Sequence, residues 1–172
     1  TLLQIFSTET RGHTESVRSE IQKCRESGIG CQVSASLLRA AHTLQGSARA
    51  VGLRPMAEAS AEIEKLMHAY KAHQHPLDEP AAALFDRLVG AVEIMIDTLS
   101  RGDTRSAGLL GEFSGVAQGA HELQSHLLAA AAAAEAAAAT QALRAPEVAQ
   151  APAAATPKPA PVSAPAGGNE TV

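Results

Sequence analysis

The sequence predicts an all-α protein, an antiparallel four-helix bundle followed by a fifth helix and a disordered tail. Large aliphatic residues recur every three or four positions through the first hundred residues. Capping residues and prolines divide this region into four segments with short connections. From Ala145 onward alanine and proline dominate, with little apolar surface to bury. We therefore expect the bundle over residues 1–101, an Ala/Gly-rich helix over 102–142 and a disordered Ala/Pro-rich linker over 143–172.

The first helix is expected over residues 2–27, and the segment SGIGCQVSAS then ends it. Ser34 or Ser36 can cap the second helix, because a serine side chain accepts a hydrogen bond from the free backbone N–H groups of the first turn. The apolar positions of this second helix alternate at spacings of four and three, which predicts one buried face. They are Leu37, Ala41, Leu44, Ala48 and Val51.

Glycine, proline and aspartate mark the limits of the third and fourth helices. Gly52 closes the second helix, and Pro55 suits the first turn of the third. Asp78 and Pro80, in the polar loop HQHPLDEP, indicate the start of the fourth. The expected buried residues are Met56, Ile63, Leu66 and Tyr70 on the third helix, and Leu84, Leu88, Val92, Met95 and Leu99 on the fourth.

A fifth helix is expected after Asp103. One side of it carries larger apolar residues, namely Leu109, Phe113, Val116, Ala120, Leu123 and Leu127. Beside them Gly111, Gly115 and Gly119 form a stripe of small residues. This stripe has two interpretations, close packing on the bundle or a surface for self-association.

Composition and charge exclude several function classes. The chain has a net charge of −4, from 14 basic and 18 acidic residues, and no basic face, which argues against binding nucleic acid. Aromatic residues make up only 2 %, so base-stacking platforms are not expected either. The most apolar run, residues 127–140, is mainly alanine and contains Glu135, which makes it too weakly apolar to span a bilayer. We therefore expect a cytoplasmic protein with no membrane partner.

Metal and cofactor sites are not expected. Cys24 and Cys31 are interpreted as two reduced thiols of a cytosolic protein rather than a disulfide. The glycines of residues 27–30 lack the lysine of a phosphate-binding loop, so the chain is not expected to hold a nucleotide. The other histidines do not have the spacing of a metal site, and they include His73, His75, His121 and His126.

A histidine and a glycine interrupt the second predicted helix, although neither residue favours helices. His42 lies one residue past Ala41 of the apolar stripe, which places it about 100° around the helix, on the half-exposed flank of the bundle. Gly46, one turn later, leaves room for a group on the imidazole or for a partner. Gln45 and Arg49 share this flank and offer amide donors and a positive charge.

The segment HTLQGSARAVGL, which begins at His42, resembles the H-x-L-K-G-S-A-x-x-x-G-L motif of histidine phosphotransfer (HPt) domains. It is most similar to those of chemotaxis-type sensor kinases, particularly kinases with several HPt domains that control type IV pili. The resemblance covers residues 1–101 and implies a phosphorelay function without independent turnover. It implies that His42 accepts a phosphoryl group from a histidine kinase catalytic domain and passes it to an aspartate of a response-regulator receiver domain.

The resemblance also implies a role for Glu64. In the chemotaxis-kinase version, a glutamate 22 residues after the histidine hydrogen-bonds its Nδ1, and Glu64 occupies that position. A carboxylate there fixes the imidazole tautomer and leaves the Nε2 lone pair free to attack phosphorus. The residues alone leave an alternative open, in which Glu64 is a solvated carboxylate paired with Lys65 or His68.

Position 45 departs from the motif, since the family usually has lysine where this chain has Gln45. An amide offers a dipole to phosphoryl oxygens, whereas lysine offers a full charge. This leaves open a second hypothesis, a docking or dimerisation scaffold that has lost phosphotransfer. The presence of His42, Gly46 and Glu64 together favours the relay.

Overall fold

The structure, a computed structural model, describes residues 1–27, 30–102 and 107–144. Within these residues the chain forms helices but no β-sheet, so the predicted all-α fold class is confirmed. The helices are α1 (Leu2–Ser27), α2 (Ala35–Ala50), α3 (Arg54–Ala72), α4 (Glu79–Ser100) and α5 (Ala107–Arg144). The linker expected over 143–172 lies outside the described residues, apart from the last two residues of α5. None of the described helices combines the length and apolar character needed to cross a membrane.

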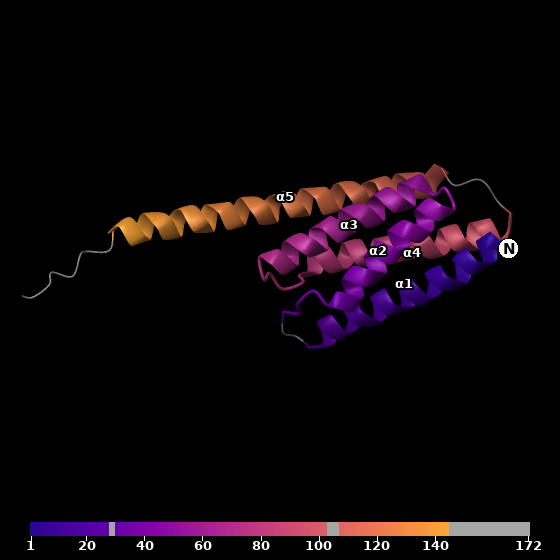
Figure 1. Cartoon of the computed structure of the whole chain (residues 1–172), viewed down its shortest axis with the longest axis horizontal. Coiled ribbons are helices and arrows are strands. Elements are labelled where there is room, and N and C mark those ends of the chain that lie inside the picture. The colour runs from indigo at the N-terminus through magenta and orange to yellow at the C-terminus, as the bar shows by residue number, and fades with distance from the viewer. Residues whose placement is uncertain (28–29, 103–106, 145–172) are drawn as a thin grey trace, which may run out of the picture.

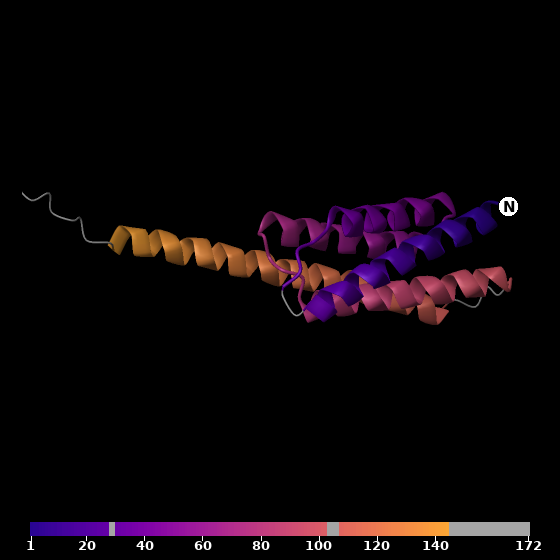
Figure 2. The same ribbon diagram turned by 90° about the horizontal axis from the view of Figure 1, so that it is seen from below.

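Helices α1 to α4 lie side by side as a bundle, and α5 covers one side of it (Figure 1). Helix α1 contacts α2 and α4, and α3 contacts α2 and α4, which closes the ring of four helices. Helix α5 packs along both α3 and α4 and then continues past the end of the bundle (Figure 2). Among the described helices, α5 therefore leaves α2 uncovered.

Local capping sets the ends of the helices that carry the site. Of the two candidate serines, Ser34 is the N-cap of α2, and its hydroxyl accepts a hydrogen bond from the Leu37 backbone N–H. Gly52 follows α2 with a φ of +77°, a conformation that favours glycine. Asp78 is the N-cap of α4, as expected, and accepts from the Ala81 N–H at 3.0 Å.

The predicted apolar stripes meet in one core. Every expected core residue of α2, α3 and α4 is buried except Val51 and Leu99, which lie at helix ends and are half-buried. Helix α5 adds Phe113, Val116, Ala120 and Leu127 to this core, whereas Leu109 and Leu123 pack at its margin. Through these residues, α5 shares one hydrophobic core with the bundle.

Two of the three stripe glycines of α5 allow close approach to α4. A Cβ added at Gly115 would lie 2.8 Å from the Arg87 guanidinium, and one at Gly119 would lie 2.8 Å from the Leu84 side chain. Gly111 faces open space. Of the two interpretations of the stripe, the structure therefore supports close packing on the bundle for Gly115 and Gly119.

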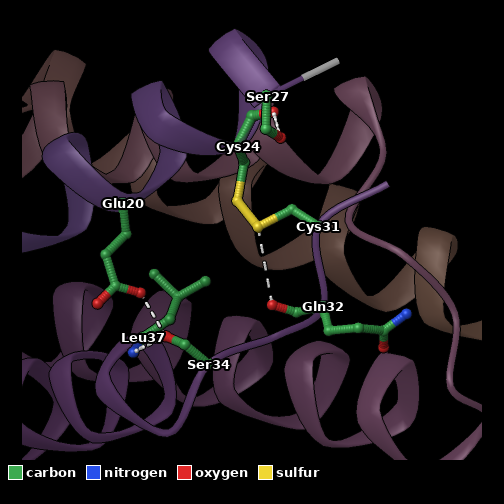
Figure 3. Close-up of a disulfide and its surroundings, with 7 residues drawn as sticks. All are labelled: Glu20, Cys24, Ser27, Cys31, Gln32, Ser34 and Leu37. Carbon is green, nitrogen blue, oxygen red and sulfur yellow. Dashed lines mark hydrogen bonds between the residues drawn. A yellow bond between two sulfur atoms is a disulfide. The ribbon is translucent and has the colours of Figure 1, made fainter. Parts of the chain in front are cut away.

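Cys24 and Cys31 form a disulfide, so the interpretation of two reduced thiols is wrong (Figure 3). Their Cα atoms lie 5.3 Å apart, a normal separation for such a bond. The pairing depends on how the chain turns back after α1, which spacing alone does not reveal. Gly30 lies so close to the α3–α4 loop that an added Cβ would be 2.5 Å from the Pro76 side chain. The Leu77 N–H then donates to the Cys31 carbonyl at 2.6 Å.

A second contact ties the start of α2 to α1. The Ser34 hydroxyl donates to the Glu20 carboxylate while it accepts from the Leu37 backbone (Figure 3). With the disulfide, this contact fixes the segment that leads into α2, the helix that carries His42.

Reduction of the disulfide is expected to lower the free energy of unfolding by about 2.5 kcal/mol, the chain-entropy value for so short a closed loop. Urea denaturation with and without dithiothreitol measures this difference. The double variant Cys24→Ser/Cys31→Ser should unfold like the reduced protein and should no longer respond to the reductant. Two alkylatable thiols in the untreated protein, or identical unfolding curves, would contradict the pairing.

Candidate functional site

The candidate site lies where α2 and α3 run side by side. On each helix the site residue immediately follows a buried one, Ala41 before His42 and Ile63 before Glu64. This spacing turns both side chains to the edge of the bundle. The His42 side chain is 72 % exposed, more than the half-exposure expected, whereas Glu64 is only 20 % exposed. The carboxylate is thus sheltered and the imidazole faces solvent.

His42 and Glu64 meet across the two helices, with 3.0 Å between His42 Nδ1 and Glu64 Oε1. An ionised carboxylate can only accept hydrogen bonds, so this contact favours the tautomer with the proton on Nδ1. The Nε2 atom then keeps its lone pair, on the side of the ring away from Glu64. Such an imidazole is oriented to act as a nucleophile.

The two alternative partners of Glu64, Lys65 and His68, make different contacts in the structure. Lys65 pairs with Glu62 at 2.6 Å, so it is occupied by a different carboxylate. His68 Nε2 lies 3.8 Å from the same Glu64 Oε1 that His42 contacts. The spacing of four residues on one helix had indicated that His68 and Glu64 are neighbours, and His68 therefore adjoins the site together with His42.

Gln45 and Arg49 extend the site in a direction that the sequence did not predict. Only one orientation of the Gln45 amide satisfies both of its neighbours: its nitrogen donates to Glu64 Oε2 at 3.3 Å and its oxygen accepts from Arg49 at 3.0 Å. Both residues were expected to face a phosphoryl group on His42. In the structure they form a connected chain that ends at the carboxylate of Glu64, and their contact with a phosphoryl group stays a prediction.

Gly46 faces solvent beside this cluster. A Cβ added at Gly46 would have no neighbouring atom within 4 Å, so packing within the described chain does not require glycine there. The space that Gly46 leaves is thus open to a group from outside, next to the exposed ring of His42.

A groove of about 680 Å³ adjoins the site along α2 and α3. Three cations line it, Arg49, Arg54 and Lys65, together with the carboxylates of Glu58 and Glu62. Arg49 belongs both to this groove and to the chain that reaches Glu64. The groove therefore gives a partner a polar surface to contact next to His42.

A second groove of about 560 Å³ lies between the α3–α4 loop and α5. Its lining includes His73, His75 and His126, but none of the five predicted site residues. Tyr70, also in the lining, donates to Asp78 at 2.9 Å, and burial together with this hydrogen bond raises the pKa of its phenol. In the described parts of the chain, no three His, Cys, Asp or Glu side chains gather to hold a metal ion.

The fold and the site together define the class of this protein. It is a helical bundle with an exposed histidine on its surface, paired with a carboxylate. The Hpt domain family model matches residues 1–102, and the chain belongs to this family. Membership assigns it a role in histidine phosphotransfer within phosphorelay signalling. Comparison with curated proteins gave no match, and comparison with solved structures gave none either.

Proposed function

We propose that His42 accepts a phosphoryl group from the catalytic domain of a histidine kinase and passes it to an aspartate of a response-regulator receiver domain. The observation that carries this proposal is the contact between His42 Nδ1 and Glu64 Oε1 at 3.0 Å on a ring that is 72 % exposed. The contact orients the ring, and the exposure lets a partner reach Nε2.

In the first step, Nε2 of the neutral His42 ring attacks the γ-phosphorus of ATP held by the kinase. The bond from nitrogen to phosphorus forms as the bond from phosphorus to the leaving oxygen of ADP breaks. The Nδ1 proton stays in place, so the ring becomes positively charged as Nε2 gives up its lone pair. Glu64 stabilises that charge through the existing hydrogen bond.

In the second step, a carboxylate oxygen of the receiver aspartate attacks the phosphoryl group. The bond between Nε2 and phosphorus breaks, and the electron pair returns to Nε2, which restores the neutral imidazole. Positioning and metal ions dominate the catalysis of phosphoryl transfer, and we assign the magnesium to the partners, because this chain contributes the carrier and its orientation.

The segment from His42 to Leu53 favours a chemotaxis-type kinase as the parent protein, of the kind with several HPt domains that controls type IV pili. A kinase that consumes ATP places the domain in the cytoplasm. The Cys24–Cys31 disulfide argues against this location, since disulfides are rare in cytosolic proteins and are usually transient there.

Incubation with a chemotaxis-type kinase catalytic domain and labelled ATP tests the proposal. The chain should become labelled through a bond that is lost in acid and survives alkali, as a phosphohistidine does. Labelled ATP without the kinase should give no label. A chain that stays unlabelled with the kinase domain of its own parent protein would support the docking or dimerisation scaffold instead.

A further inference from the structure

We infer that Gln45 is a positioning residue, which holds the Glu64 carboxylate on His42 and away from His68. This inference rests on the proposed function, because it concerns the orientation of the residue that we propose to carry the phosphoryl group. It differs from the expectation that Gln45 contacts the phosphoryl group itself.

Two imidazoles lie near one oxygen of Glu64. Oε1 lies 3.0 Å from His42 Nδ1 and 3.8 Å from His68 Nε2, and both histidines are largely exposed, at 72 % and 64 %. The last torsion of a glutamate side chain is broad, so the carboxylate can turn easily between neighbouring donors. A contact that fixes the plane of the carboxylate would keep it on the histidine at 3.0 Å.

Gln45 supplies that contact at the other oxygen of the carboxylate. Its Nε2 donates to Glu64 Oε2 at 3.3 Å, and the hydrogen bonds at the two oxygens together fix the plane of the carboxylate. Arg49 in turn donates to the Gln45 oxygen at 3.0 Å, one helical turn further along α2. The guanidinium thus holds the amide and polarises it toward the carboxylate.

Glutamine suits this position because it both donates and accepts hydrogen bonds. A lysine at position 45 could donate to Glu64 but could not accept from Arg49. The amide therefore joins two groups of opposite charge, and the positive charge of Arg49 acts on the site through Gln45 rather than at the phosphoryl group.

The tautomer of His42, read from its imidazole ¹⁵N chemical shifts in alkaline buffer, tests this inference without a kinase. In the wild-type protein the Nδ1–H form should dominate. The Gln45→Met variant keeps the length of the side chain but loses both hydrogen bonds, so its Nδ1–H fraction should fall clearly. Arg49→Met should shift the fraction in the same direction by less. The matched control Arg39→Met removes an exposed charge from α2, three residues before His42, and should leave the tautomer unchanged.

A second experiment removes the His68 imidazole. In the Gln45→Met background, His68→Ala should restore much of the Nδ1–H fraction, because Glu64 then has only His42 to contact. Labelling of Gln45→Met by the kinase should be slower by roughly fivefold, the rate equivalent of one ordinary hydrogen bond.

The positioning role is overturned if Gln45→Met leaves the tautomer of His42 unchanged, whatever happens to labelling. It is also overturned if His68→Ala restores nothing. Failure of the proposed function looks different: the wild-type protein then stays unlabelled, while the tautomer measurements still report on Gln45.

Discussion

The His42→Gln variant is expected to lose all phosphorylation by the kinase and to keep its fold. The His42 side chain is 72 % exposed and has Glu64 as its hydrogen-bond partner, so its removal leaves the core intact. Surface substitutions of this kind usually change stability by no more than about 0.5 kcal/mol. Labelling with radioactive ATP and thermal unfolding followed by circular dichroism measure the two effects on one preparation.

His68→Gln is the matched control, because His68 is a second exposed histidine beside the same carboxylate. This variant should retain labelling. Label that survives His42→Gln, or that moves to His68 or another histidine, would refute His42 as the acceptor. A variant that is both unlabelled and unfolded would refute the expectation that His42 is dispensable for the fold.

The second large effect is expected for Glu64→Ala, which should slow phosphorylation of His42 about tenfold to a hundredfold without preventing it. A hydrogen bond to a charged group contributes about 1.5–3 kcal/mol, and each 1.4 kcal/mol changes a rate about tenfold. Glu64 keeps 20 % of its side chain exposed, and solvent screening therefore favours the lower part of this range. Initial rates of labelling at fixed kinase and ATP concentrations measure the effect.

Glu15→Ala is the control for this experiment. Glu15 is an exposed carboxylate of α1 and does not line the groove beside the site, so its removal changes the net charge equally without touching the site. Its rate of labelling should stay close to that of the wild-type protein. Equal slowing of both variants would show that Glu64 acts only through surface charge, whereas an unchanged rate in Glu64→Ala would remove it from the site.

Most of the helical architecture could be predicted from the sequence because local rules govern it. The apolar period and the segment SGIGCQVSAS placed α1 over Leu2–Ser27, and Asp78 marked the start of α4. The choice between Ser34 and Ser36 as the cap of α2 was not local, since Ser34 is also held by Glu20 of α1. The role of the α5 glycines likewise could not be predicted without knowing where α4 lies, because a stripe of small residues does not identify its neighbour.

The candidate site could likewise be predicted only in part from the sequence. A histidine next to an apolar stripe predicts an exposed imidazole, and the family resemblance pointed to Glu64, which the structure places 3.0 Å away. The contact between Gln45 and Glu64 joins two helices through rotamers that the spacing of residues does not specify. His68, four residues after Glu64 on the same helix, could instead be predicted as its neighbour from spacing alone.

Local sequence patterns were enough to predict which segments are helical, which face of each is buried and that His42 lies on an exposed flank. These properties follow from the periodicity of side chains along a helix, which is a property of neighbouring residues. The bond between Cys24 and Cys31, and the chain of contacts from Arg49 through Gln45 to Glu64, became visible only once the helices were packed together. These contacts depend on how the chain turns between helices and how the helices are set against each other, and a linear pattern does not encode that geometry.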